Sequence, residues 1–148
     1  MKNKSTNNSS FAIPESDYLY LEPSQIDGSG QGLRTAIDIY KDECFAQFEG
    51  ELLNQKQANE RAENRENGYF ISLLNGRILD SKNTDCFAKF ANDAEGFIQS
   101  NFKNNSKITL NQQNKVCLMA TKKIKAGEEI FCGYGKKYWE SFKEQNAT

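Results

Sequence analysis

The sequence predicts a mostly β domain with a short helical insert and a C-terminal helix. Short apolar runs alternate with turn residues from residue 18 onward, as in small β folds. One segment near the middle of the chain is instead rich in glutamine, glutamate, alanine and arginine and has no glycine or proline, which favours a helix. The chain has 148 residues, the length of a single domain that can bury a core without disulfides or zinc.

The folded domain is expected to cover residues 15–148. The N-terminal segment 1–14 is expected to be disordered, because it opens with a polar stretch rich in asparagine and serine that has no apolar periodicity. Each expected strand contains apolar or aromatic residues and is bounded by turn-forming or charged residues. These strands are Tyr18–Leu21, Leu33–Ile37, Cys44–Phe48, Tyr69–Leu73, Arg77–Asp80, Cys86–Ala91, Val116–Thr121 and Glu129–Cys132.

The helical insert is expected over Asn54–Glu66, with the Asn54 side chain as its N-terminal cap. The apolar residues of this segment are Ala58 and Ala62, which are four positions apart and therefore share one face. We expect that narrow face to contact the domain and the rest of the helix to be solvated.

The C-terminal helix is expected over residues 136–144. Tyr138 and Phe142 are four residues apart, and Trp139 lies beside them on the same helical face. This aromatic face either packs on the domain or covers a bound ligand, and the sequence leaves both interpretations open.

The segments Leu33–Glu43 and Leu118–Glu128 resemble each other at an offset of 85 residues. Both read leucine, then small residues, an isoleucine, a turn, and a glutamate that precedes an apolar strand. A single offset of this size is not a solenoid period. The similarity predicts two related β-hairpin units within one domain, with chance similarity as the alternative.

Composition excludes several classes of protein. The formal net charge of −1 is not that of a strongly basic nucleic-acid-binding domain. The sequence has no apolar run of about eighteen residues, so no transmembrane helix is expected. The N-terminal residues contain no apolar signal-peptide core, so we expect an intracellular, reducing compartment.

The sequence contains no histidine, which removes every Ser-His-Asp and Cys-His catalytic arrangement. Cys44, Cys86, Cys117 and Cys132 form no C-x-x-C pair, so no metal site is expected and the thiols are interpreted as small buried residues. Any chemistry must then come from tyrosine, carboxylates, lysine, backbone groups or a cofactor.

Four segments match the motifs of one family in order and spacing. Residues 28–33 read GSGQGL, matching the motif G-x-G-L, and residues 48–51 read FEGE, close to Y-x-G-E. Residues 69–93 end in AKFAND, close to A-R-F-x-N-H. Residues 120–135 read ATKKIKAGEEIFCGYG, close to A-x-x-x-I-x-x-G-E-E-[IL]-x-x-x-Y-G. From about residue 18 to about residue 140, the chain resembles the SET domain, the β-clip fold of most protein-lysine methyltransferases.

Several positions depart from the family pattern. Phe48 stands where many members have tyrosine, and Asp93 stands where histidine is usual. The S-C-x-P-N run of the family is missing, and residues 94–96 and 104–105 occupy that stretch. The chain therefore resembles a minimal SET domain without pre-SET or post-SET zinc modules.

The resemblance implies methyl transfer from S-adenosylmethionine to a lysine amine of a protein. No metal is needed, because the sulfonium is already an activated leaving group. The resemblance assigns the cofactor to Gly30, Gln31, Gly32, Leu33, Asn92, Asp93, Tyr134 and Trp139. Without it, the glycines would be interpreted as a plain turn and Asn92 as a turn cap.

Tyr134 is the catalytic residue that the resemblance implies, because a phenolic hydroxyl beside the transfer path can orient the amine and the methyl group. Phe48, Tyr69 and Cys132 are the expected walls of the substrate channel. In this family the position two residues before the catalytic tyrosine helps to set the degree of methylation, and a small Cys132 is expected to permit di- and trimethylation. The alternative is that these side chains belong to the core.

Charge is distributed unevenly along the chain. Residues 42–66 have a net charge of −4, and residues 101–148 have a net charge of +5. The acidic stretch covers the insert that lies beside the peptide groove in SET domains, so a basic, lysine-bearing protein segment such as a histone tail is the expected partner. No direct nucleic-acid contact and no membrane contact are expected. The oligomeric state stays open, and a nuclear location is suggested by the family resemblance and not by the sequence.

Two other functions remain open on the sequence. Phe48, Asp93 and the missing S-C-x-P-N run suit a catalytically weak SET module that binds a protein partner. A non-enzymatic β-clip domain of the antifreeze-like kind would share the hairpin motif, but Asn92 and Tyr134 at their spacing argue against it.

Overall fold

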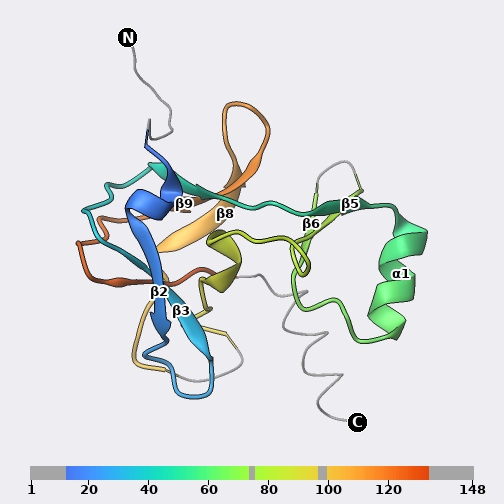
Figure 1. The fold of residues 1–148 in the computed structure, drawn as a ribbon, viewed down its shortest axis with the longest axis horizontal. Coiled ribbons are helices and arrows are strands. Elements are labelled where there is room, and N and C mark those ends of the chain that lie inside the picture. Colours follow the sequence, from blue (N-terminus) through green and yellow to red (C-terminus); the bar gives the residue numbers. More distant parts are fainter. Residues whose placement is uncertain (1–12, 74–75, 97–99, 134–148) are drawn as a thin grey trace.

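The structure, a computed structural model, describes residues 13–73, 76–96 and 100–133. Their strands form three small antiparallel sheets (Figure 1). The first sheet has the order β10-β3-β2, the second β4-β9-β8 and the third β5-β7-β6. The strands are β2 (Leu19–Pro23), β3 (Gln31–Thr35), β4 (Cys44–Gln47), β5 (Glu51–Leu53), β6 (Phe70–Ser72), β7 (Ile78–Asp80), β8 (Ser106–Leu110), β9 (Val116–Ala120) and β10 (Glu129–Ile130).

Helical structure in the described residues is short, so the prediction of a mostly β fold is confirmed. One α-helix, α1, spans Gln55–Glu63, and two 3₁₀ turns, η1 and η2, span Glu15–Asp17 and Ala88–Phe90. The expected C-terminal helix over residues 136–144 lies outside the described residues, as do residues 1–12 of the expected disordered segment.

The expected strand over Cys86–Ala91 is wrong, because this segment forms the single turn η2. Its backbone closes locally, with the amides of Phe90 and Ala91 donating to the carbonyls three residues earlier. The turn allows the Lys89 ammonium to donate to the carbonyl oxygens of residues 81, 82 and 84, at 3.2, 3.3 and 2.9 Å. An extended strand would not fold the chain back in this way.

Two strands were not expected from the sequence. β5 is only three residues long and lies directly before the helix. β8 follows a polar run, and its own apolar residues are only partly buried. Both are fixed by their partners, because β5 pairs with β7 and β8 pairs with β9 along its whole length. Such short strands depend on cross-strand pairing more than on intrinsic preference.

The helical insert begins as predicted and ends earlier than predicted. The Asn54 side chain accepts a hydrogen bond from the Gln57 amide at 2.9 Å, and the Gln57 side chain accepts one from the Asn54 amide at 2.9 Å. This is a capping box, which satisfies two of the free amides at the helix start. Ala58 is buried and most of the remaining surface is solvated, as the narrow apolar face predicts.

Arg61 attaches α1 to the third sheet. Its guanidinium donates to Asp80 Oδ2 at 2.7 Å and to both carboxylate oxygens of Glu51, at 2.9 and 3.1 Å. Asp80 is 1% exposed, so this guanidinium stabilises a buried carboxylate on β7. Gly50 permits the close packing, because a Cβ there would lie 2.7 Å from the carbonyl carbon of Asp80. Figure 1 shows the resulting unit of α1, β5 and β6 at one end of the molecule.

The repeated segments 33–43 and 118–128 are structural equivalents that pair with each other. Ile39 and Ile124, at equivalent positions, exchange both backbone hydrogen bonds at 2.8 Å. Equivalent bonds surround this pair: the Asp42 amide donates to the Ala120 carbonyl, and the Gly127 amide donates to the Thr35 carbonyl. The segments are therefore related by a local pseudo-twofold axis, which confirms that they are two related units. They are not the expected β-hairpins, because β3 and β4 of the first unit, and β9 and β10 of the second, belong to different sheets.

The turns of the two units match in the same detail. Glu43 accepts a hydrogen bond from the Tyr40 amide and Glu128 accepts one from the Lys125 amide, each at 2.7 Å. Asp42 and Gly127, which are equivalent, both have positive φ angles, of 74° and 91°. Each glutamate thus fixes a turn in which the preceding residue is left-handed.

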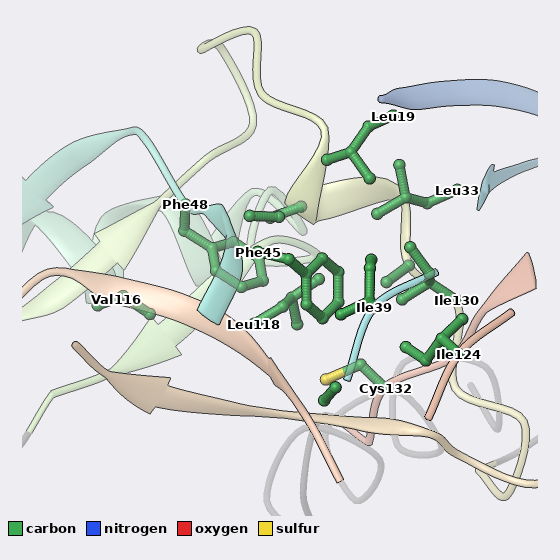
Figure 2. Close-up of a cluster of buried hydrophobic side chains, with 14 of the residues drawn as sticks. Leu19, Leu33, Ile39, Phe45, Phe48, Val116, Leu118, Ile124, Ile130 and Cys132 are labelled. Carbon is green, nitrogen blue, oxygen red and sulfur yellow. The ribbon is translucent and has the colours of Figure 1, made fainter. Parts of the chain in front are cut away.

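The main hydrophobic core lies where the two repeated units meet the first and second sheets. Figure 2 shows Phe45 near the middle of this cluster, with Phe48 and Val116 toward one end and Ile124 and Ile130 toward the other. Its buried members include Leu19, Leu33, Ile39, Phe45, Phe48, Val116, Leu118, Ile124, Ile130 and Cys132.

We expect Ile39→Ala and Ile124→Ala each to lower the free energy of unfolding by about 2–5 kcal/mol, because both side chains are fully buried at equivalent positions of the pseudo-twofold unit. Denaturant unfolding measures the loss. Leu52→Ala is the matched control; this side chain is 55% exposed on β5, and its removal should cost less than about 1 kcal/mol. Wild-type stability in either isoleucine variant would contradict the role of the paired units.

Candidate functional site

Three of the motif segments meet at one place in the fold. The Asn92 side-chain amide donates to the Gln31 carbonyl at 3.0 Å. The Asn92 carbonyl accepts a hydrogen bond from the Cys132 amide at 2.8 Å, and Asn92 forms a parallel bridge with Phe131. Asn92 therefore joins the first residue of β3, at the end of the glycine-rich loop, to the chain that follows β10 and leads to Tyr134.

Gly30 and Gly32 are glycines for different physical reasons. Gly30 has a φ angle of +67° and open space on its Cβ side, so its backbone conformation favours glycine. Gly32 is buried, and a Cβ there would lie 2.9 Å from Cδ of Glu129 and closer still to Oε2. Leu33, the last residue of the motif, is fully buried in the main core. Within residues 30–33, Gly30 and Gln31 are therefore the exposed positions.

Asp93 belongs to a hydrogen-bonded loop that takes the place of the missing S-C-x-P-N run. Its Oδ1 accepts hydrogen bonds from the Asn104 side-chain amide and the Glu95 backbone amide, each at 2.9 Å. The Asn104 side-chain oxygen accepts in turn from the Ala94 amide at 2.8 Å. A Cβ at Gly133 would meet Asn104 Nδ2 at 3.3 Å and Asp93 Oδ2 at 3.9 Å. The loop therefore lies against the residue that directly precedes Tyr134.

Asn105 fixes the strand that approaches the site. Its side-chain oxygen accepts from the Phe131 amide at 2.9 Å, and its side-chain amide donates to the Glu129 carbonyl at 3.0 Å. Its backbone amide donates to the Phe131 carbonyl at 3.0 Å. A buried asparagine thereby substitutes for a neighbouring strand beside residues 129–131.

The expected channel residues have unequal environments. Phe48 and Cys132 are buried members of the main core cluster, whereas Tyr69 is 38% exposed at the edge of the third sheet. The Lys89 ammonium lies 5.6 Å from the centre of the Tyr69 ring, within cation–π range. Phe48 and Cys132 thus share one cluster, and the role of all three as channel walls stays a prediction.

The Cys132 thiol is held in its neutral form. Burial raises the pKa of this thiol to about 12, and the negative charge of Asp93 adds to the shift. Asp93 is therefore close enough to act electrostatically on the residue two before Tyr134. Tyr134 and Trp139 themselves lie outside the described residues.

Sequence reasoning missed several residues that build this site. Ser24, Glu129, Asn104 and Asn105 make its supporting hydrogen bonds, and Lys89 lies beside Tyr69. Glu129 could have been singled out because it is a charged residue at the start of an apolar strand. The adjacent asparagines at 104 and 105 offered a weaker sign, because such pairs are also common in plain loops.

Ion pairs neutralise part of the negative charge that the sequence predicts for the insert. Glu51 is bound to Arg61, which lowers the pKa of the Glu51 carboxyl through that hydrogen bond, and Glu66 lies 3.4 Å from the Lys82 ammonium. Glu60 and Glu63 remain exposed on α1 without an ion pair in the described part of the chain. The acidic surface is therefore smaller than the sequence count suggests.

Within the described residues, no group of three or more cysteine, aspartate or glutamate side chains is placed to hold a metal ion. The helices described there are too short or too polar to cross a membrane.

The small sheets, the paired turn units and the convergence of the glycine loop with Asn92 define a β-clip domain of the SET type. The sequence model of the SET domain family matches residues 30–135 of the chain. The chain belongs to the SET-domain family.

Similar curated proteins carry histone-related names. The chain is 32% identical over 110 residues to the mouse and human proteins named "Histone-lysine N-methyltransferase, H3 lysine-36 specific", and this match covers 71% of the chain and 4% of those proteins. It is 29% identical over 133 residues to "Histone-lysine N-methyltransferase EZ1" of Zea mays, covering 86% of the chain and 13% of that protein. The chain thus spans a small fraction of the length of these relatives.

Solved structures show the same relationship. A humanized mutant of the Chaetomium thermophilum Polycomb Repressive Complex 2 bound to the inhibitor GSK126 is similar with a TM-score of 0.66 and 29% identity. This similarity covers 79% of the chain and 15% of the matched chain. A crystal structure of an active polycomb repressive complex 2 in the basal state gives the same TM-score and identity.

We expect Cys132 to resist thiol reagents in the folded protein at pH 8, because a thiol with a pKa of about 12 is only about one part in ten thousand thiolate at that pH. Cys44 and Cys86 are half-buried, not buried as expected, so they should react before Cys132, and denaturant should expose all four thiols. Mass spectrometry of the labelled peptides measures this order. Equal labelling of Cys132 and Cys86 would contradict this environment.

The folded protein also holds the Cys132 proton more tightly than the unfolded chain. The contribution of this group to the free energy of unfolding should therefore fall as the pH rises from about 9 to 12.

Proposed function

We propose that the chain transfers a methyl group from S-adenosylmethionine to a lysine side chain of a protein. The hydrogen bond between Asn92 and Gln31, beside the strand that leads to Tyr134, is the observation that best supports this proposal. It brings together two of the residues that the SET motifs assign to the cofactor. The names of the similar curated proteins, all histone-lysine methyltransferases, support the same activity.

The polar groups at this place fit the amino-acid end of S-adenosylmethionine. Gly30 and Gln31 are exposed main-chain positions, and the Asn92 side-chain oxygen has no hydrogen-bond partner among the described residues. Carbonyl and amide oxygens suit an ammonium group, and exposed backbone amides suit a carboxylate. Bound there, S-adenosylmethionine would supply a methyl group that is already activated by its sulfonium.

The protein must also present a neutral lysine amine. A lysine with an ordinary pKa of about 10.4 needs about 4–5 kcal/mol to be neutral at pH 7. The apolar side chains of Phe48 and the neutral thiol of Cys132 disfavour an ammonium, which lowers this cost. Because the chain has no histidine, the proton would leave to water. Tyr134 would orient the amine through its hydroxyl, while Trp139 would cover the cofactor.

The proposed substrate is a basic protein segment, with histone tails as the first candidates. The similar relatives are named for histones, and the exposed Glu60 and Glu63 on α1 would attract lysine-rich peptides. A histone substrate would also place the protein in the nucleus. Incubation of the protein with labelled S-adenosylmethionine and either core histones or a whole-cell lysate tests the proposal, and absence of any labelled protein would count against it.

A second candidate function is a catalytically weak SET module that binds a protein partner. The Asp93–Asn104 pair favours it, because Asp93 replaces the usual histidine and its Oδ1 is occupied by the loop. Binding of labelled S-adenosylmethionine separates the two functions, since only the enzyme requires it.

We expect Asn92→Ala to weaken S-adenosylmethionine binding by about 1.5–3 kcal/mol, because it removes a hydrogen bond to a charged group and the support of the Gln31 carbonyl. Calorimetry measures the affinity. Asn59→Ala, which removes a side-chain amide from the exposed face of α1, should bind normally. Unchanged affinity in a folded Asn92→Ala variant would rule out this placement of the cofactor.

We expect Tyr134→Phe to keep the fold and the cofactor affinity but to lose most of the turnover, because the change removes one hydroxyl group and little packing. A radiolabel transfer assay measures the rate. Tyr40→Phe removes a hydroxyl from a tyrosine that is 54% exposed and should remain active. Methylation by Tyr134→Phe at the wild-type rate would show that Tyr134 is not the catalytic group.

A further inference from the structure

Glu129, at the start of β10, has a carboxylate buried against the glycine-rich loop. The residue is 2% exposed. Its Oε2 accepts a hydrogen bond from the Ser24 hydroxyl at 2.7 Å, and its Oε1 accepts one from the Gln25 backbone amide at 2.8 Å. No lysine or arginine of the described residues lies within ion-pair distance of this carboxylate. The donors of the loop are therefore what stabilises its buried charge.

The same carboxylate occupies the space beside Gly32. A Cβ at position 32 would lie 2.9 Å from Cδ of Glu129 and 3.1 Å from Cα of Ser24, so the glutamate and the loop backbone together require this glycine. The Ser24 amide donates to the Gly30 carbonyl at 2.7 Å and closes the loop across its base. Glu129 thus contacts both the beginning and the end of the loop 24–32.

An apolar contact holds the loop from a second side. Ile26 is buried with Ala94 and Phe131, and Phe102 packs against this small cluster. The rings of Phe102 and Phe131 are stacked at 5.3 Å. Phe131 is two residues after Glu129. The same segment of the chain therefore holds the loop by hydrogen bonds at Glu129 and by apolar packing at Phe131.

The backbone of Glu129 is also hydrogen-bonded to the side chain of Asn105. Its carbonyl accepts a hydrogen bond from the Asn105 side chain, and Asn105 in turn holds Phe131. The next residues along the chain are Cys132, Gly133 and Tyr134. A shift of Glu129 would therefore move the glycine loop and the approach to the proposed catalytic tyrosine together.

We propose that Glu129 is a positioning residue that holds the loop 24–32 in the shape that binds S-adenosylmethionine. The inference rests on the proposed function, because it assigns the cofactor to Gly30 and Gln31. The glutamate does not touch the cofactor. It acts through Ser24, Gln25 and Gly32, and the other end of the loop is fixed by Asn92 at the Gln31 carbonyl.

Glu129→Gln tests this inference with little change of size. In a glutamine one of the two carboxylate oxygens is replaced by an amide nitrogen, which donates and cannot accept from the loop donor that faces it. We expect the Kd for S-adenosylmethionine, measured by calorimetry, to rise about tenfold, and the KM for the peptide substrate to stay within about twofold. Ser24→Ala should act in the same direction. Amide hydrogen exchange of residues 25–32 in the free protein should become faster in both variants.

Gly32→Ala provides the sharper test. In the wild-type background its methyl group should displace the carboxylate and weaken cofactor binding about tenfold, whereas in a Glu129→Ala background the remaining close contact is with the Ser24 Cα at 3.1 Å and the loss should be clearly smaller. An equal loss in both backgrounds would show that the methyl group acts independently of the carboxylate, and the inference would be wrong. If Glu129→Ala does not fold, the Glu129→Gln and Ser24→Ala affinities decide alone.

Glu128→Gln is the matched control. Glu128 is the adjacent, exposed glutamate, and its carboxylate accepts from the Lys125 amide in the turn. This variant should bind the cofactor as the wild type does. Wild-type affinity and exchange rates in Glu129→Gln and Ser24→Ala would overturn the positioning role while leaving the proposed function intact. Failure of the folded wild-type protein to bind S-adenosylmethionine would instead overturn the proposed function, and the inference with it.

Discussion

The reciprocal pairing of Ile39 with Ile124 is the constraint on which the rest of the structure depends. These two residues are far apart in the chain, yet they exchange both backbone hydrogen bonds at the centre of the two repeated units. Once they are paired, each unit must place its following strand beside the strand that opens the other unit. β4 then pairs with β9, and β10 pairs with β3. The two core sheets and the position of the glycine loop on β3 all follow from this arrangement.

The repeat and most strands could be predicted from the sequence because their causes are local. Apolar residues flanked by turns mark β2, β3, β4 and β9, and the Asn54 cap marks the start of α1. η2, β5 and β8 could not be predicted in this way. η2 depends on carbonyls that the loop 81–84 presents to Lys89, and β5 and β8 depend on the strands beside them. These are tertiary contacts, and a local pattern contains no information about them.

The candidate site likewise contains residues that local sequence patterns predict and residues that depend on tertiary contacts. The motif residues Gln31 and Asn92 were predicted as cofactor residues, and the fold brings them into hydrogen-bond contact. The physical reason given by the motif was incomplete, however, because a buried carboxylate and the Ser24 backbone also require a glycine at position 32. Residues that support the site by filling space or by accepting from a backbone amide have no fixed spacing to the residues they hold. Ser24 and Asn105 are such residues, and their roles become visible only in the folded protein.

The site forms where the two repeated units differ. At one pair of equivalent positions the first unit has Cys44 and the second has Glu129, and each begins the strand that follows a capped turn. Cys44 lies opposite Met119 in the second sheet, whereas Glu129 lies opposite Arg34 and reaches the loop at Ser24. The shared backbone geometry fixes where this side chain can point, and the chemistry of the side chain decides what it holds. A thiol at this position needs no partner, whereas a buried carboxylate requires donors and so constrains the loop that supplies them. One scaffold position thus holds a half-buried thiol in one unit and, in the other, a buried carboxylate that is hydrogen-bonded to the glycine loop.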